Sequence, residues 1–284
     1  MLFMYKIESG EMQIIRQSGR EVINFYGGVV VRDTDALITS PAALYYQKEG
    51  VMDLSGPVSG FQGGRNLRCR TARIYENDKT FKGYGNCEIE GIGEYLKCDS
   101  VILSGDQVIA FGDVFLKSDK DSIEAGGQVL YIKENYLKSS GNSFLKYPGE
   151  DSLVLFSKTY TYKDSVLNAR GAVNIFSREF EGSCDSLLYM RNSRIAYLIG
   201  NGAAKNSTNL LKGDTILVFL TEGNRMDSSI ALSKASLLNQ EKGNELFLEG
   251  DTLLFYSEKT DSLKWFRAYN VKGYYKEGAA DGNP

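Results

Sequence analysis

Four cysteines are the side chains of this sequence with the most obvious chemical potential. The chain contains no histidine, which removes the commonest general base and every Ser–His or Cys–His nucleophile pair. The cysteines stand at Cys69, Cys87, Cys98 and Cys184 without a CxxC pair, so their spacing does not indicate a zinc site. We expect four buried core thiols. A Cys69–Cys98 disulfide would require their Cα atoms to lie within about 7 Å.

A recurring column of aspartates is the second candidate for chemistry. Asp99, Asp185, Asp214 and Asp251 each follow a small residue, and grouped carboxylates could bind a metal or hydrolyse a glycoside. These four come from different repeats at one fixed position, where Arg70 stands in another repeat. We therefore expect an exposed ladder of solvated charges. The sequence predicts no catalytic residue, no metal site and no cofactor.

Composition favours an all-β protein of moderate size. The chain has 284 residues, 42% of them hydrophobic, with 30 Gly, 4 Pro, 18 Tyr and 14 Phe, a balance typical of turns that join aromatic-containing strands. A net charge of −3 provides no basic surface for nucleic acid. No stretch approaches the roughly 18 apolar residues of a membrane-spanning helix, and Met1–Tyr5 is too short for the apolar segment of a signal peptide.

Seven glycines reveal an internal repeat of about 29 residues. Each follows a short apolar run, and the successive intervals are 29, 29, 27, 29, 30 and 29 residues. The glycines are Gly27, Gly56, Gly85, Gly112, Gly141, Gly171 and Gly200. Eleven residues after each glycine begins a stretch in which apolar and polar residues alternate, and this period of two predicts a half-buried strand. The sequence thus predicts about eight repeats of two strands each.

The repeats run through the chain without a change in composition. We therefore expect a single domain over residues 1–275 and a polar tail over 276–284. The last copy is irregular, with about eight extra residues that we place near Leu238–Asn244. Helix signals are weak, and the best candidate is the segment Ser228–Gln240.

Small residues form a column on the inward face of the predicted strands. Thirteen residues after the repeat glycines stand Ser40, Cys69, Cys98, Ala125, Cys184 and Gly213. Aliphatic residues flank this column, which predicts a lengthwise apolar groove for a thin, greasy ligand; the alternative is close packing by another sheet or a loop. The predicted groove residues are Ile38, Leu44, Leu67, Leu96, Ile102, Ile123, Val129, Leu188, Leu211, Leu217, Leu248 and Leu254. By the same alternation, Arg73 is expected to face inward.

The repeat unit resembles that of the OstA-like (LptA-like) periplasmic lipopolysaccharide-transport family. Clear matches are the segments that start at Gly85-Asn86 and at Gly171-Ala172-Val173, each with Cys-Asp-Ser thirteen residues after its glycine. The resemblance covers residues 20–275 and rests on seven or eight copies in phase rather than on any single motif.

The resemblance implies an elongated, open-ended, twisted β-jellyroll in the periplasm. Its apolar interior would carry the acyl chains of lipopolysaccharide to the outer membrane, and the protein would not be an enzyme. The alternative from another class is a structural or adhesive parallel β-solenoid with a filled core. An enzyme on a β-helix would need acids and bases clustered at one level, whereas the sequence shows charge ladders.

Both ends of the predicted stack read as strands without a cap. Met12–Arg16 and Trp265–Tyr275 have strand-forming composition, and an unpaired strand edge is a template for another strand. We therefore expect head-to-tail β-augmentation, with another copy or with a related β-jellyroll partner.

Overall fold

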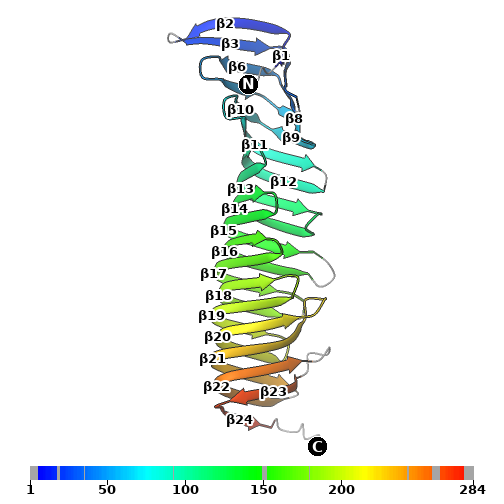
Figure 1. The fold of residues 1–284 in the computed structure, drawn as a ribbon, viewed down its shortest axis with the longest axis vertical. Helices are drawn as coiled ribbons and strands as arrows, with labels where there is room; N and C mark the ends of the chain where they lie inside the picture. The colour runs from blue at the N-terminus through cyan, green and yellow to red at the C-terminus, as the bar shows by residue number, and fades with distance from the viewer. Residues whose placement is uncertain are drawn as a thin grey trace, which may run out of the picture. The chain divides into compact units, whose positions relative to one another are not determined.

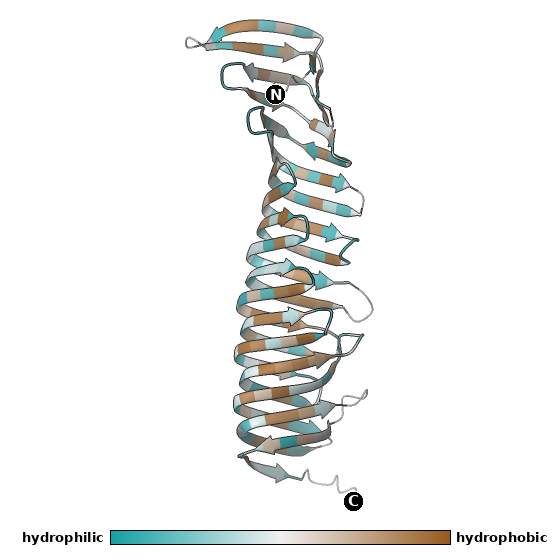
Figure 2. Cartoon of the chain, in the orientation of Figure 1, coloured by the Kyte–Doolittle hydropathy of each residue, from teal (hydrophilic) through white to brown (hydrophobic). Residues whose placement is uncertain are grey.

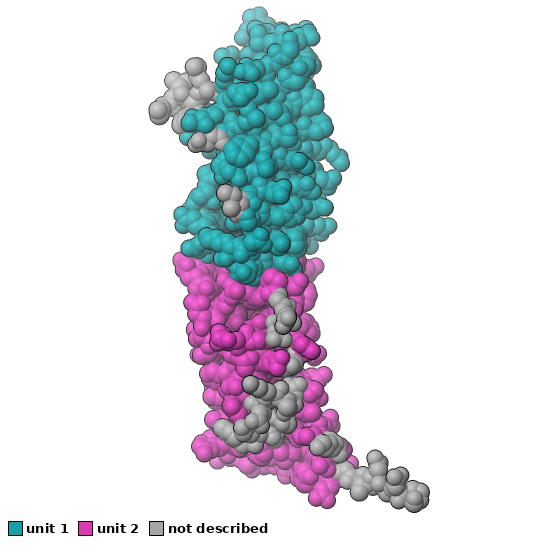
Figure 3. Space-filling view, turned by 90° about the vertical axis from the view of Figure 1, so that its right-hand side faces the viewer, with its two compact units in different colours: residues 1–139 teal, residues 140–284 magenta. Residues whose placement is uncertain are grey.

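The computed structural model describes residues 6–17, 20–34, 36–91, 93–148, 152–178, 180–241, 243–257 and 263–277. These residues fall into two compact units, 1–139 and 140–284 (Figure 3). The expectation of one domain over residues 1–275 stays a prediction.

The structure is all-β, as predicted. Strands hold most of the described residues, which contain no helix, so none of them could cross a membrane as one. The strands are β1 Lys6–Glu8, β2 Glu11–Gln17, β3 Arg20–Tyr26, β4 Val29–Arg32, β5 Ala36–Ser40, β6 Ala42–Tyr46, β7 Val51–Ser55, β8 Val58–Gln62, β9 Arg65–Cys69, β10 Thr71–Tyr75, β11 Thr80–Gly91, β12 Glu94–Ser104, β13 Gln107–Ser118, β14 Ile123–Lys133, β15 Tyr136–Tyr147, β16 Leu153–Lys163, β17 Val166–Phe176, β18 Glu181–Met190, β19 Ile195–Lys205, β20 Asn209–Leu220, β21 Met226–Glu241, β22 Asn244–Ser257, β23 Leu263–Tyr269 and β24 Lys272–Lys276.

In unit 1, two ladders of short strands lead into long bent strands. One ladder runs β1–β4–β5–β8–β9–β11, and the other runs β2–β3–β6–β7–β10–β11. Because β11 belongs to both, it joins the ladders into one sheet that folds over on itself. From there β12, β13 and β14 follow as consecutive antiparallel neighbours (Figure 1).

Unit 2 has the same antiparallel pattern, with long strands up to β22 followed by two shorter strands. Strands β16 to β22 pair consecutively in antiparallel fashion, and β23 and β24 each pair with β22. Every strand pairing among the described residues is antiparallel, so the parallel β-solenoid is wrong and the open β-jellyroll is confirmed. The segment 228–240 lies within β21, which shows that its weak helix signal had no structural meaning.

A bulge bends the strand pairs at one level. Gly85 and Asn86 of β11 both have positive φ, 76° and 50°, and together they lie opposite the single residue Asp99 of β12. Such a two-for-one bulge disrupts the ladder locally and bends the strand. Equivalent register shifts recur between the other long strands. We call this bend the corner.

The repeat glycines are the residues that make the corner possible. All seven have positive φ, between 70° and 87°, a conformation that costs other L-residues roughly 1–2 kcal/mol. At Gly112 a Cβ atom would also overlap the carboxylate of Asp99. The interval of about 29 residues is therefore the length of two bent strands, from the corner glycine of one strand to the corner glycine two strands further along the chain.

The corner divides each long strand into two arms that face one another. The first arm contains hairpins such as residues 87–98, in which the end of β11 pairs with the start of β12. The second arm contains hairpins such as residues 101–111, in which the end of β12 pairs with the start of β13. Side chains alternate between the inside and the outside of the arms, which Figure 2 shows as alternating brown and teal bands. The hairpin turns at the free ends of the arms form an edge opposite the corner, which we call the mouth.

The predicted insertion near Leu238–Asn244 is right only in part, because about half of the extra length falls in this hairpin. Residues 238–241 extend β21, which at 16 residues is longer than its neighbours, and Asn244 begins β22 directly after a turn. The extra length is spread along β21 and the turn before it, because Ser233 and Lys234 form the corner bulge of this long strand.

Candidate functional site: the interior and its mouth

The corner changes which residues of a strand face inward. In β12, Leu96 and Cys98 are buried before the corner at 4% and 3% exposure, and Val101 is buried after it at 1%. Buried positions are thus two residues apart on each arm but three apart across the corner. The bulge places two residues of β11 opposite one residue of β12. In β12 the inward residues therefore change from even to odd numbers at the corner, whereas in β11 they have odd numbers on both sides of it.

Six of the twelve predicted groove residues face the interior. All six precede the corner in their strands or repeats and are 2–9% exposed. They are Ile38, Leu67, Leu96, Ile123, Leu211 and Leu248. The small column is also inward, since Ser40, Cys69, Cys98, Ala125 and Cys184 are buried.

The inward placement of the other six is wrong. Leu44, Ile102, Val129, Leu188, Leu217 and Leu254 follow the corner and are only half-buried. The residue beside each is buried instead: Ala43, Val101, Leu130, Leu187, Ile216 and Leu253. The prediction assumed an unbroken period of two through the corner, whereas the bulge shifts the period by one residue. Arg73 is likewise outward, and its Nη2 donates to Asp53 Oδ2 at 2.8 Å.

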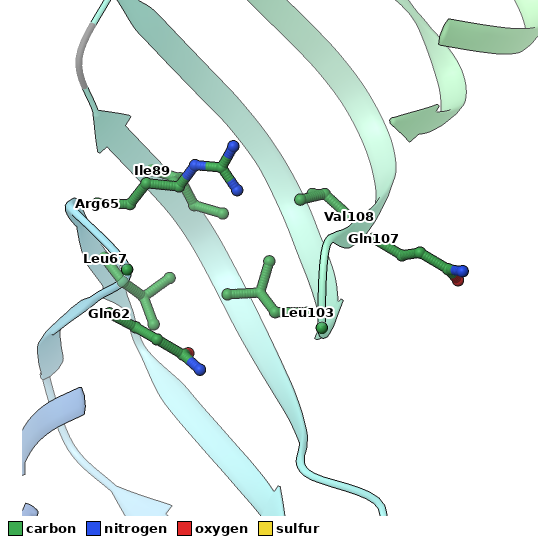
Figure 4. Close-up of a pocket in the computed structure, with 9 residues that line it drawn as sticks. Gln62, Arg65, Leu67, Ile89, Leu103, Gln107 and Val108 are labelled. Atoms are coloured by element: carbon green, nitrogen blue, oxygen red, sulfur yellow. The ribbon is translucent and has the colours of Figure 1, made fainter. Parts of the chain in front are cut away.

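A hollow of about 370 Å³ opens at the mouth of unit 1. Its apolar lining comes from both arms, with Leu67 and Ile89 on the first and Leu103 and Val108 on the second. In Figure 4 these four side chains point toward one another across the hollow. The hollow therefore connects the space between the arms with the outside.

Polar groups surround this apolar lining. Gln62, Arg65 and Gln107 also line the hollow, together with turn glycines from each arm. Arg65 Nη2 lies 3.1 Å from Glu94 Oε2, and both side chains are partly exposed. Such an arrangement suits a ligand with an apolar body and a polar head, because the body leaves water while the head stays near the rim.

In unit 2 aromatic side chains connect the two arms. Tyr147 lies after the corner of β15, and its ring centroid is 6.4 Å from that of Tyr162 and 6.1 Å from that of Tyr189. The Arg191 guanidinium lies over the Tyr147 ring at 4.7 Å, within cation–π range. Burial, followed by the neighbouring tyrosines, raises the pKa of Tyr147. Tyr147 thus makes a buried aromatic contact between the arms.

The aspartate column stabilises corners. Asp185 and Asp251 are exposed, and their carboxylates accept hydrogen bonds from the side-chain amides of Asn201 (3.0 Å) and Asn270 (2.7 Å). Both asparagines have positive φ, so each bond holds a left-handed residue in place. No group of three His, Cys, Asp or Glu side chains in the described part of the chain could hold a metal ion.

Sequence reasoning identified Leu67 but missed the other three apolar residues that line the hollow at the mouth. Ile89, Leu103 and Val108 were not among the predicted residues, although each is an aliphatic residue near a hairpin turn. Counting inward positions from both sides of the corner would have identified Leu103, because it follows Val101 at the strand period of two.

Comparisons with known proteins bear on the family of this chain. No curated protein matches the chain. Among solved structures it is similar to LptH from Pseudomonas aeruginosa, described as the LptA homologous periplasmic component of the conserved lipopolysaccharide transport device. That match has 14% sequence identity and a TM-score of 0.32, and it covers 34% of this chain and 76% of that one. A family model for LptA and the LptD N-terminal domain, LPS transport proteins, matches residues 37–224. Because this match spans more than half of the chain, and agrees with the resemblance of the repeats, the chain belongs to the LptA/LptD N-terminal family of lipopolysaccharide transport proteins.

Proposed function

We propose that this protein carries lipopolysaccharide by holding its acyl chains between the two arms. The observation that supports this proposal is the hollow at the mouth of unit 1, lined by Leu67, Ile89, Leu103 and Val108 from facing arms. Each methylene group moved out of water contributes about 0.8 kcal/mol. The proposed ligand enters through the mouth, with its acyl chains inside and its sugar and phosphate groups at the polar rim.

The inward aliphatic residues form the rest of the proposed acyl-chain path. These are the six that the sequence identified before the corner, together with their corrected partners after it, such as Val101 and Leu130. Buried side chains fill much of this interior, so binding of long acyl chains requires the arms to move apart. The mouth is where that separation begins, because it is the edge at which the arms are not joined by continuous strands.

We also propose that the protein is a carrier and not an enzyme, and that it works in the periplasm. The lack of histidine and the structural use of the aspartate column support the first part. The family supports the second, since its relative LptH is described as a periplasmic component.

We propose in addition that copies of this protein, or this protein and a related β-jellyroll partner, join head to tail. At one end, among the described residues, β1 pairs only with β4 and β2 only with β3. At the other end, β23 and β24 pair only with β22 within the described part. These edges leave backbone groups that another strand can pair with. Joining unlike edges produces open chains rather than closed dimers.

Charge substitutions on adjacent residues test the lipid proposal. Leu103→Glu places a carboxylate in the apolar hollow, and we expect it to weaken lipopolysaccharide binding by at least about tenfold, because a buried charge without a partner is strongly unfavourable. Ile102→Glu is the matched control, since this neighbour is also half-buried but faces away from the interior. Binding would be measured by titration of purified protein with fluorescent lipopolysaccharide, and equal affinities of the two variants would contradict the proposal.

A further inference from the structure

Three of the four cysteines form a row across neighbouring strands of unit 1. Cys69 ends β9, Cys87 follows the corner in β11, and Cys98 lies in β12. Cys87 and Cys98 are direct register partners, and continuation of the β9–β11 register places Cys87 opposite Cys69. All three face the interior, with exposures of 7%, 0% and 3%.

The three thiols are close enough to interact. The Cys87 thiol is near enough to the Cys69 and Cys98 thiols for each pair to affect the other's pKa, and it donates a hydrogen bond to the Asp99 carbonyl oxygen at 3.6 Å. Opposite residues of antiparallel strands have Cα atoms about 4.5–5.5 Å apart, within the range of about 4.4–6.8 Å that disulfides require. Cys69 and Cys98 are two strands apart, roughly 9–10 Å, so only pairs that include Cys87 can be linked.

We propose that this row is a disulfide-exchange site in which Cys87 is bonded alternately to Cys98 and to Cys69. The oxidant is a disulfide, such as a small-molecule disulfide of an oxidising compartment. The Cys98 thiolate attacks one oxidant sulfur and releases one thiol; Cys87 then attacks the Cys98 sulfur and releases the second. Two protein thiols are oxidised, and the oxidant is reduced to two thiols that take up the two protons. Because Cys87 is fully buried in the folded protein, this step takes place during folding.

The third thiol then moves the bond. Cys69 gives up its proton as its sulfur attacks the Cys87 sulfur, a Cys69–Cys87 bond forms, the Cys87–Cys98 bond breaks, and the Cys98 sulfur leaves and takes up that proton. Thiol–disulfide exchange proceeds by direct displacement at sulfur, for which the three sulfur atoms should lie nearly in line. The strand register places Cys87 between Cys69 and Cys98 in the row.

Within the folded row, the acidity of the thiols differs. The hydrogen bond from Cys87 lowers the pKa of the Cys98 thiol. At Cys87 the bond from Cys69 lowers the pKa, but the bond to Cys98 and burial raise it to about 12 overall. Thiolate is the reactive form, so Cys98 is the thiol of this pair that ionises first.

The remaining cysteine and the sister repeats supply matched controls. Cys184 is also buried but belongs to unit 2 and is not part of the row. Ser40 and Ser157 are buried and occupy the last inward position before the corner in their own strands, which is the position of Cys69 and Cys98. Serine at either of these positions is therefore compatible with the fold.

Peptide mapping tests the proposal independently of lipid binding. The full-length protein would be refolded in a glutathione redox buffer, free thiols alkylated, and the linked peptides identified by mass spectrometry; cleavage after Arg70 and Lys97 separates the three thiols. We expect a mixture of Cys69–Cys87 and Cys87–Cys98 bonds, with Cys184 alkylated. Cys69→Ser should leave only Cys87–Cys98, Cys98→Ser only Cys69–Cys87, and Cys87→Ser neither, while Cys184→Ser should give the same mixture as the wild-type protein.

Three outcomes would overturn it. Four free thiols in the folded wild-type protein would show that the row is not oxidised. A Cys69–Cys98 bond would show that the strand register does not govern pairing. A single bond in the wild-type protein that does not redistribute when isolated and incubated would rule out exchange.

Discussion

Replacing Leu187 with alanine should lower the free energy of unfolding by about 2–5 kcal/mol, the usual cost of truncating a buried leucine. Leu187 is 4% exposed and faces the interior just after the corner of β18. The same replacement at Leu188 should cost about 1 kcal/mol or less, because this side chain is half-buried and lies on the outer face. Urea denaturation monitored by circular dichroism would measure both.

These two variants have the same starting and final residue types at adjacent positions. Helix or strand propensity and side-chain volume are therefore matched, and burial alone separates them. An unbroken period of two would make Leu188 the inward residue. Equal losses, or a larger loss for Leu188→Ala, would contradict the reversal of parity at the corner.

Ile14→Pro should abolish self-assembly while the isolated chain stays folded. Ile14 lies in β2, is 63% exposed, and has a described pairing partner only in β3. Proline removes a backbone N–H and is poorly tolerated in a paired strand, so a second chain can no longer add to this edge. In light scattering, we expect the mean mass of the wild-type protein to rise with concentration and that of the variant to stay at the monomer value.

Two further variants define the cause of that loss. Ile14→Thr keeps the N–H and the β-branched shape while removing apolar surface, so it should still assemble. Tyr269→Pro, in the edge strand β23 at the opposite end, should also block assembly, because unlike edges join. A wild-type protein that stays monomeric at all concentrations would contradict self-assembly and leave only joining to a related partner.

Much of the fold was predictable because its repeat has a simple physical basis. Each corner needs a residue at positive φ, which glycine adopts readily, so Gly85 and its six counterparts mark the repeat in the sequence. Strands were predictable from the alternation of apolar and polar residues on either side of the corner. The inward placement of Leu96 and Cys98 followed from that alternation.

The interior after the corner was not predictable in the same way. A bulge adds one residue to one strand of a pair and leaves no distinct trace in the other, so nothing in the sequence of β12 itself marks the reversal between Cys98 and Val101. The mouth was missed for a related reason. It combines Leu67 and Leu103, which belong to different hairpins and come together only because the arms fold over on each other.

Site-specific photo-crosslinking at adjacent residues is the most direct test of lipid transport between the arms. A photoreactive phenylalanine at Leu103 would lie in the 370 Å³ hollow, and at Ile102 it would lie on the outer face of the same strand. After incubation with lipopolysaccharide and irradiation, the Leu103 variant should form a covalent lipopolysaccharide adduct, and the Ile102 variant should form little or none. Equal adduct formation at both positions, or adduct at Ile102 alone, would contradict the proposal that the acyl chains lie between the arms.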